Sequence, residues 1–236
     1  MKRFIFLIFI PIISFTVFAH EMEGIYKNGS DSLVFSGDNI TFSVSGFAGL
    51  SSVQVGEGKF ELFGNFILVN TTNFSGEKSS FQELVGNKKD TFIVEVVSKL
   101  NYPVQGILIE SINSSNKTVS AKVTGNDGKA TLVNQDKTSK LKVSALGYNT
   151  ITVDFKKDKD YLVKIAENIV IENKTVVFSY EIIDDETISL LLLTDDFNSG
   201  KNLDNELNRL SKRAKRNNLL HKRYSKELIP FRGSVN

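Results

Sequence analysis

Cysteine and tryptophan are absent from this chain of 236 residues, and histidine occurs only twice, as His20 and His221. Without cysteine there is no disulfide bond, so the core alone must hold the fold together. A Ser-His-Asp or Cys-His site needs a histidine beside its nucleophile, and zinc sites built on histidine and cysteine lack their ligands. Eighteen phenylalanines and only three prolines exclude a disordered or collagen-like chain. Composition therefore predicts a folded protein that is not an enzyme and carries no cofactor or metal.

Phosphate-binding and dinucleotide-binding glycine motifs are also missing from the sequence. Carboxylate chemistry stays open on composition alone, because a glycosidase needs only two facing carboxyl groups. The acidic clusters, however, fall in predicted turns, where solvated charges are the simpler interpretation. These clusters are Asp158 with Asp160, residues 184–186, and Asp195 with Asp196.

The first 19 residues have the pattern of a secretory signal peptide. Lys2 and Arg3 precede an apolar run over residues 4–18, and the small residue Ala19 follows it. The run is shorter than the ~20 residues that a membrane-spanning helix needs. We therefore expect export to the periplasm or the cell exterior, with cleavage after Ala19.

Charge is segregated along the predicted mature chain. Residues 196–236 hold 10 basic and 4 acidic side chains, a net charge of +6, which leaves −6 on residues 20–195. A basic tail on an acidic body can dock on that body or reach for an acidic partner.

Residues 20–90 predict a small antiparallel meander, or partial barrel. Two hairpins are expected, one over residues 32–44 and one over residues 59–69, because β-branched and aromatic residues flank Gly, Asn and Asp turns. Residues 71–90 are polar and are interpreted as a linker or a long loop into a second unit. The spacing of the first 45 residues of this region resembles a lipocalin-like meander of secreted bacterial proteins. The positions that carry the resemblance are Gly24, Tyr26, Leu33, Asp38, Thr41, Phe42, Gly58, Lys59, Phe60, Gly64 and Asn65.

Residues 91–165 contain three blocks in a characteristic order: residues 102–109, residues 123–132 and residues 141–148. The first holds a Pro-Val-x-Gly motif, the second an Asn-Asp-Gly turn, and the third ends in Gly-Tyr. In order and spacing the blocks resemble the carboxypeptidase-regulatory-like domain, a transthyretin-like β-sandwich of about seven strands. The resemblance implies a non-catalytic folding or binding unit.

Each residue of these blocks also has a structural role of its own. Pro103 can open a strand where no backbone donor is needed, and Asp127 with Gly128 supplies the conformation of a tight turn. Gly147 lets the backbone bend so that Tyr148 packs inward. The motif residues are Pro103, Gly106, Asp127, Gly128, Gly147 and Tyr148.

Residues 166–195 predict further strands, which either pair with the first meander or extend the sandwich; pairing with the meander is the preferred interpretation. Residues 196–236 predict a basic amphipathic helical tail. The predicted apolar seam of the helix is Leu203, Leu207, Leu210, Ala214, Tyr224 and Leu228, and its later turns carry Arg209, Lys212, Arg213, Lys215 and Arg216. We expect the tail to lie on the acidic body, to bind an anionic membrane surface or to bind a protein. Leu203, Leu207, Leu210, Arg213 and Arg216 are the candidate contacts.

The sequence thus predicts an all-β exported protein with a meander or partial barrel, a seven-stranded sandwich and a C-terminal helix. The predicted function is non-catalytic binding or scaffolding in the cell envelope, with an unknown protein or glycan as partner and no nucleic acid. A peripheral membrane protein acting through its helix and a carboxylate-only glycan hydrolase are the alternatives.

Overall fold

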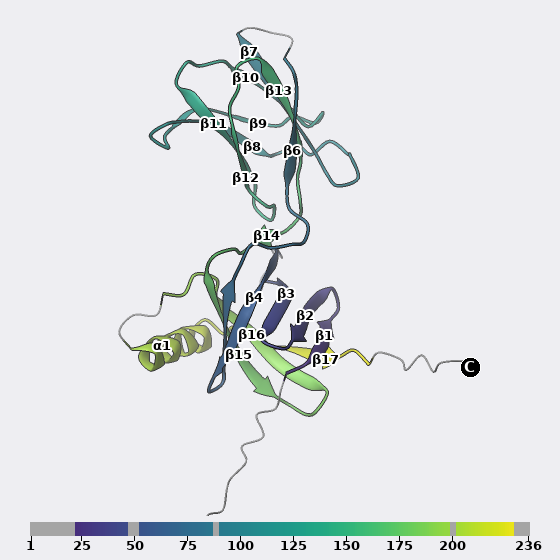
Figure 1. Cartoon of the computed structure of the whole chain (residues 1–236), viewed down its shortest axis with the longest axis vertical. Helices are drawn as coiled ribbons and strands as arrows, with labels where there is room; N and C mark the ends of the chain where they lie inside the picture. Colours follow the sequence, from purple (N-terminus) through teal and green to yellow (C-terminus); the bar gives the residue numbers. More distant parts are fainter. Residues whose placement is uncertain (1–21, 47–51, 87–89, 199–201, 229–236) are drawn as a thin grey trace, which may run out of the picture.

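The computed structural model describes residues 22–46, 52–86, 90–198 and 202–228. The predicted leader, residues 1–19, and its cleavage site lie outside the described residues. Within them the protein is mostly β-strand, with one short helix, which confirms the all-β prediction. Figure 1 shows a barrel and a second unit made of two sheets.

The barrel is a ring of eight antiparallel strands. Five of them precede the second unit in the sequence and three follow it, and each strand is hydrogen-bonded to the strand on either side of it in the ring. The fifth strand also pairs with the fourth, and the last pairs with the first, so the ring is closed rather than the partial barrel expected. Closure removes the exposed sheet edges that an open meander would leave. In order around the ring, the strands are β1 (Gly24–Asn28), β2 (Asp31–Ser36), β3 (Asn39–Ser45), β4 (Val53–Phe63), β5 (Phe66–Thr71), β15 (Thr175–Ile182), β16 (Thr187–Thr194) and β17 (Lys222–Lys226).

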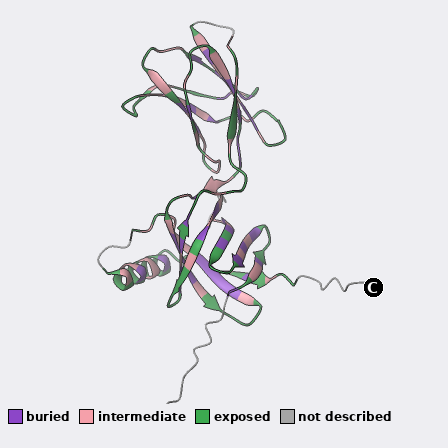
Figure 2. Cartoon of the chain, viewed as in Figure 1, coloured by how far each residue is buried: buried purple, intermediate pink, exposed green. Residues whose placement is uncertain are grey.

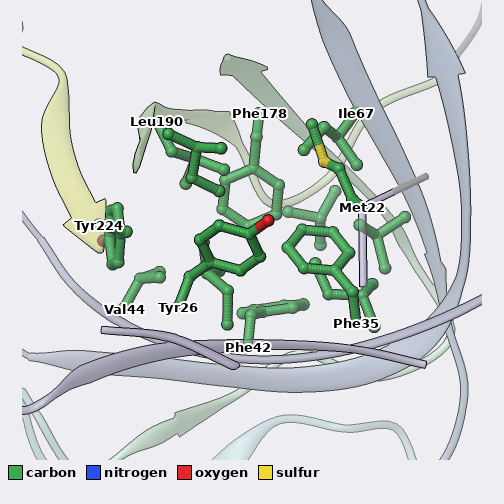
Figure 3. Packing of buried hydrophobic residues seen from close by; sticks show 14 of the residues in the cluster. Met22, Tyr26, Phe35, Phe42, Val44, Ile67, Phe178, Leu190 and Tyr224 are labelled. Atoms are coloured by element: carbon green, nitrogen blue, oxygen red, sulfur yellow. The ribbon is translucent and has the colours of Figure 1, made fainter. Parts of the chain in front are cut away.

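The barrel interior is filled by apolar side chains that alternate along the strands. In β2 the inward residues Leu33 and Phe35 are almost fully buried, and in β3 the same holds for Ile40 and Phe42. The alternation of buried and exposed residues is visible in Figure 2, and Figure 3 shows aromatic rings from several strands meeting in the centre. Phe42 packs edge-on against Phe178 at a centroid distance of 5.4 Å. An eight-stranded barrel is just wide enough for side chains to fill it.

The second unit contains residues 80–164 and is inserted between β5 and β15. It consists of two four-stranded sheets that share one apolar cluster, which has no member in common with the barrel clusters. One sheet contains β10 (Lys129–Val133), β7 (Thr91–Val97), β13 (Lys159–Lys164) and β6 (Ser80–Val85). The other contains β12 (Ile151–Asp154), β11 (Thr138–Ser144), β8 (Leu108–Asn113) and β9 (Thr118–Val123).

One sequence expectation for this region was wrong. Residues 71–90 were interpreted as a linker, but β6 lies within them and pairs with β13, so that the unit has eight strands and begins at Ser80. The strand was missed because it lies at a sheet edge, where Phe81 and Leu84 stay exposed and no alternation of burial marks it.

The helix α1 (Leu203–Arg216) connects β16 to β17 and is shorter than the predicted tail. The side chain of Asn202 caps its first turn, and the left-handed residue Asn218 (φ 53°) follows its end. Residues 222–226 are strand, not helix, because Lys222, Tyr224 and Lys226 alternate with outward residues and fill the gap between β1 and β16. Tyr224, which was predicted on the helix seam, is buried inside the barrel.

The chain segments that connect the two units lie side by side. The hydroxyl of Ser79 accepts a hydrogen bond from the backbone N–H of Ala166 at 3.0 Å. Nearby, β14 (Ile169–Val170) runs parallel to β4 and pairs with Gln54 and Val55. The second unit therefore enters and leaves the barrel at one point.

Deleting residues 80–165 and joining Ser79 to Ala166 through two glycines is expected to leave the barrel folded. The two ends are already in contact, and every residue of the barrel clusters is retained. Circular dichroism and denaturant titration of the deletion protein check this, and we expect one cooperative transition. Loss of cooperative unfolding would show that the barrel depends on the second unit.

Candidate functional site

One end of the barrel contains a small cavity, which we call the barrel mouth. Its volume is about 260 Å³. Residues from β3, β4, β16 and β17 line it, so it reaches across the ring rather than along one wall. The lining residues are Val44, Ser45, Gly46, Gln54, Leu190, Leu191, Leu192, Leu219, Lys222 and Tyr224.

A buried charge pair lies at the barrel mouth. Asp31 begins β2, and only 3% of its surface is exposed. Its Oδ2 accepts hydrogen bonds from Nζ of Lys222 at 2.8 Å and from the hydroxyl of Tyr224 at 3.2 Å. Its Oδ1 accepts from the backbone N–H of Ser45 at 2.9 Å. The ammonium also donates to the backbone oxygen of Ser45 at 2.7 Å. The pair thus joins β2, β3 and β17.

The surroundings of the pair fix its protonation. Burial raises the pKa of Asp31, but the hydrogen bonds from Lys222 and Ser45 outweigh this and hold the pKa below its usual value. Burial, together with the neighbouring carboxylate, raises the pKa of Tyr224 well above its ordinary range. At neutral pH Asp31 is therefore ionised and Tyr224 is a hydrogen-bond donor. Because the oxygens of Asp31 accept several hydrogen bonds, the carboxylate is suited to positioning and poorly suited to proton transfer.

Gln54 adds a polar atom that is not satisfied within the described part of the chain. It faces inward on β4, opposite Val44, and its Oε1 is buried without a hydrogen-bond partner. A buried acceptor without a partner is costly, so a bound molecule with an N–H or O–H group would gain by reaching it. Leu190 and Leu192 supply an apolar wall nearby. The barrel mouth can therefore hold a small molecule that has one apolar part and one donor.

The structure brings one histidine beside a serine. The sequence analysis had placed this histidine, His221, in the helical tail. Nε2 of His221 lies 3.0 Å from Oγ of Ser179 on the outer wall of the barrel. Ser179 is only 4% exposed, and burial of the ring lowers the pKa of His221 despite the opposing effects of Glu181 and the backbone of Ser189. The contact ties the segment after α1 to β15.

The predicted motif residues lie in turns and packing positions of the second unit. Gly106, Gly128 and Gly147 have φ values of 84°, 71° and 83°, which explains why glycine stands there. Oδ1 of Asp127 accepts the backbone N–H of Lys129 at 3.0 Å within the turn. Pro103 makes an isolated bridge with Val97 rather than opening a long strand, and Tyr148 packs against the apolar cluster of the unit. None of these residues lines the barrel mouth.

The candidate helix residues divide into two groups. Leu207 is buried against Phe66 and Val177 on the outer wall of the barrel, and Leu203 and Leu210 pack around the same cluster. Arg213 and Arg216 are exposed on the opposite side. The apolar face of α1 is thus already occupied by the barrel.

The acidic clusters have structural roles where the structure describes them. Oδ1 of Asp160 accepts the backbone N–H of Ile93 at 2.7 Å, and Oδ1 of Asp184 accepts that of Glu186 at 2.9 Å. Asp196 forms an ion pair with Lys174 at 3.5 Å. Among residues 22–46, 52–86, 90–198 and 202–228, no group of three or more His, Asp or Glu side chains is placed to hold a metal ion. In the same residues, no helix has the length and apolar character to cross a bilayer.

The residues of the barrel mouth were missed by the sequence analysis. Asp31 directly precedes the predicted hairpin of residues 32–44, and Lys222 and Tyr224 were assigned to the helical tail. The strand alternation of residues 222–226 was the available signal.

No family model, curated protein or solved structure matches the chain.

Proposed function

We propose that the protein is an exported, non-catalytic binding protein of the cell envelope, and that its ligand enters the barrel mouth. The observation that carries the proposal is the unsatisfied Oε1 of Gln54 inside a cavity with leucine walls. Carboxylate and ammonium charges at the mouth balance each other, so an uncharged ligand fits better than an ion. The leader pattern supports export.

The cavity also limits the size of the ligand. Its volume of about 260 Å³ is below the ~300–1,000 Å³ that is typical of sites for drug-sized molecules. We infer a small amphipathic molecule, or the end of a longer one, with an amide or hydroxyl group directed at Gln54.

The second unit supports a scaffolding role in this proposal. Its two sheets share one core, and its glycine turns match the blocks that resemble a carboxypeptidase-regulatory-like sandwich. We propose that it is a sandwich of this kind, inserted into a lipocalin-like barrel, and that it presents the barrel to a protein or glycan of the envelope.

Hexanamide and methyl pentanoate, which have equal numbers of heavy atoms, test the role of Gln54. Only hexanamide has an N–H donor. We expect hexanamide to shift the NMR signals of the backbone amides at the mouth. Gln54→Leu is expected to weaken hexanamide binding about fivefold to tenfold, since one hydrogen bond contributes ~1 kcal/mol. Binding of the ester should not weaken.

Gln82→Leu is the matched control, because Gln82 is exposed on β6 in the second unit. It should change neither affinity. The proposal fails if neither probe perturbs the mouth, or if Gln54→Leu weakens both probes equally.

A further inference from the structure

The orientation of α1 is fixed by the packing of its apolar side. Leu207 is 1% exposed and lies in a cluster with Phe66 and Val177, while Leu203 and Leu210 pack at its edge. Figure 1 shows the helix lying along the outside of the barrel. The opposite side of α1 therefore faces away from the barrel wall.

That outward side is strongly cationic at its C-terminal end. Residues 212–216 contain four basic side chains and no acidic one, and all four are exposed. Arg209, one turn earlier, pairs with Glu206 at 2.6 Å. None of the four later cations has an ion-pair partner among the described residues. We call Lys212, Arg213, Lys215 and Arg216 the basic end of α1.

Two exposed leucines adjoin the basic end. The backbone N–H of Leu219 donates to the carbonyl oxygen of Ala214 at 3.1 Å, which holds the chain against the last turn of the helix. Leu219 is 37% exposed and Leu220 is 64% exposed. Cations and apolar side chains thus lie next to each other on the surface.

We infer that the basic end of α1, together with Leu219 and Leu220, docks on a membrane containing anionic phospholipids. Basic side chains near such a surface are attracted to its negative potential, and the leucines can enter the boundary between headgroups and acyl chains. A nucleic acid or an acidic peptide could pair with the basic side chains, but neither offers an apolar region in which the exposed leucines could be buried. Docking through the outward side keeps Leu207 in its place on the barrel, unlike insertion of the apolar face of the helix.

Vesicle binding tests this inference. The purified protein, with the leader removed, is mixed with vesicles of 30% phosphatidylglycerol and 70% phosphatidylcholine, or of phosphatidylcholine alone, and sedimented. We expect binding to the anionic vesicles that weakens as salt is added. The variant Lys212→Gln, Arg213→Gln, Arg216→Gln is expected to bind about 100-fold more weakly, since each charge near the surface contributes roughly fivefold.

The matched control removes the same charge from the second unit. Lys117→Gln, Lys122→Gln, Lys140→Gln replaces three exposed lysines and should lower binding by less than about threefold. Leu219→Ser, Leu220→Ser should weaken vesicle binding and leave its salt dependence unchanged. Equal thermal unfolding of all variants verifies that each one is folded.

Three outcomes would overturn the inference: equal loss in the control variant, unchanged binding in the helix variant, or unchanged binding in the leucine variant. A fourth is tighter binding to a 20-nucleotide single-stranded DNA or to polyglutamate than to anionic vesicles, with no effect of the leucine substitutions. That result would assign the basic end to a soluble polyanion instead. The basic side chains of α1 do not line the mouth, so their replacement tests vesicle binding apart from hexanamide binding, and each proposal can fail alone. Leu219 lines the mouth, so the leucine variant is used in the vesicle assay only.

Discussion

Replacing Asp31 by alanine is expected to lower the free energy of unfolding by about 3 kcal/mol. Removing one partner of a buried ion pair leaves the other charge without compensation, which typically costs about 3–5 kcal/mol. Lys222 keeps its hydrogen bond to the backbone oxygen of Ser45, so we expect the lower end of this range. Urea titration, with the change in midpoint at constant slope, measures the effect.

The exposed pair of Lys27 and Glu227 is the natural control, because its atoms are also 2.8 Å apart. Its side chains are 49% and 44% exposed, against 23% and 3% for Lys222 and Asp31. Glu227→Ala should therefore cost less than about 1 kcal/mol. Equal costs for Asp31→Ala and Glu227→Ala would show that burial does not strengthen the pair. Asp31→Leu with Lys222→Met should recover most of the loss, since an apolar pair can replace a buried ion pair.

The same variant should change the response to acid. The pKa of Asp31 is lowered on folding, so the unfolded chain binds the proton first. The contribution of Asp31 is complete above the unfolded pKa of about 4 and is lost as the pH falls through the lower, folded value. The stability difference between wild type and Asp31→Ala should hence shrink as the pH falls below about 5.

Gly58→Ala is expected to destabilise the barrel by about 3 kcal/mol or more. A Cβ atom on Gly58 would lie 2.1 Å from the backbone oxygen of Asn70. Gly58 pairs with Ile40 of β3 on one side and with Thr71 of β5 on the other. The backbone of β5 must move to make room, and overpacking that shifts side chains and backbone typically costs about 1–3 kcal/mol and occasionally more. Denaturant titration would measure the loss.

Gly46→Ala, directly after the end of β3, gives a comparison with Gly58→Ala. Among the residues that the structure describes, its added Cβ would meet only the backbone oxygen of Ser52, at 3.9 Å, which is an ordinary contact distance. We expect a change within about 1 kcal/mol. If both alanine variants unfold at the same urea concentration, the close approach of β4 and β5 is not a constraint on the barrel.

Local patterns in the sequence were sufficient for the hairpins and turns of the barrel. The pairs β2–β3 and β4–β5 join at Gly37 and Gly64, whose left-handed conformations belong to tight turns. The turn at residues 184–186 between β15 and β16 was predicted as well. In these hairpins, the alternation of apolar and polar residues that marks each strand lies within a few positions of the turn that joins the strands.

Features that depend on distant pairing could not be predicted in the same way. Tyr224 matches a helical spacing that begins at Leu203, and only pairing with β1 and β16 makes residues 222–226 a strand. The contact of Asp31 with Lys222 joins residues 191 positions apart. An edge strand such as β6 buries too little to leave a pattern. The candidate site consists largely of such residues, which is why composition and motifs did not find it.

The pairing of β1 with β17 has a consequence for the order in which the two units can fold during synthesis. Tyr26 is synthesised well before its partner Lys226, because the whole second unit lies between them in the sequence. The inserted sheets are complete by Ile165 and can fold while the ring is still open. Until the final segment appears, β1 and β16 each present a free edge to other chains. A protein truncated before residue 222 would thus contain a folded second unit and an open barrel whose unpaired strand edges promote aggregation.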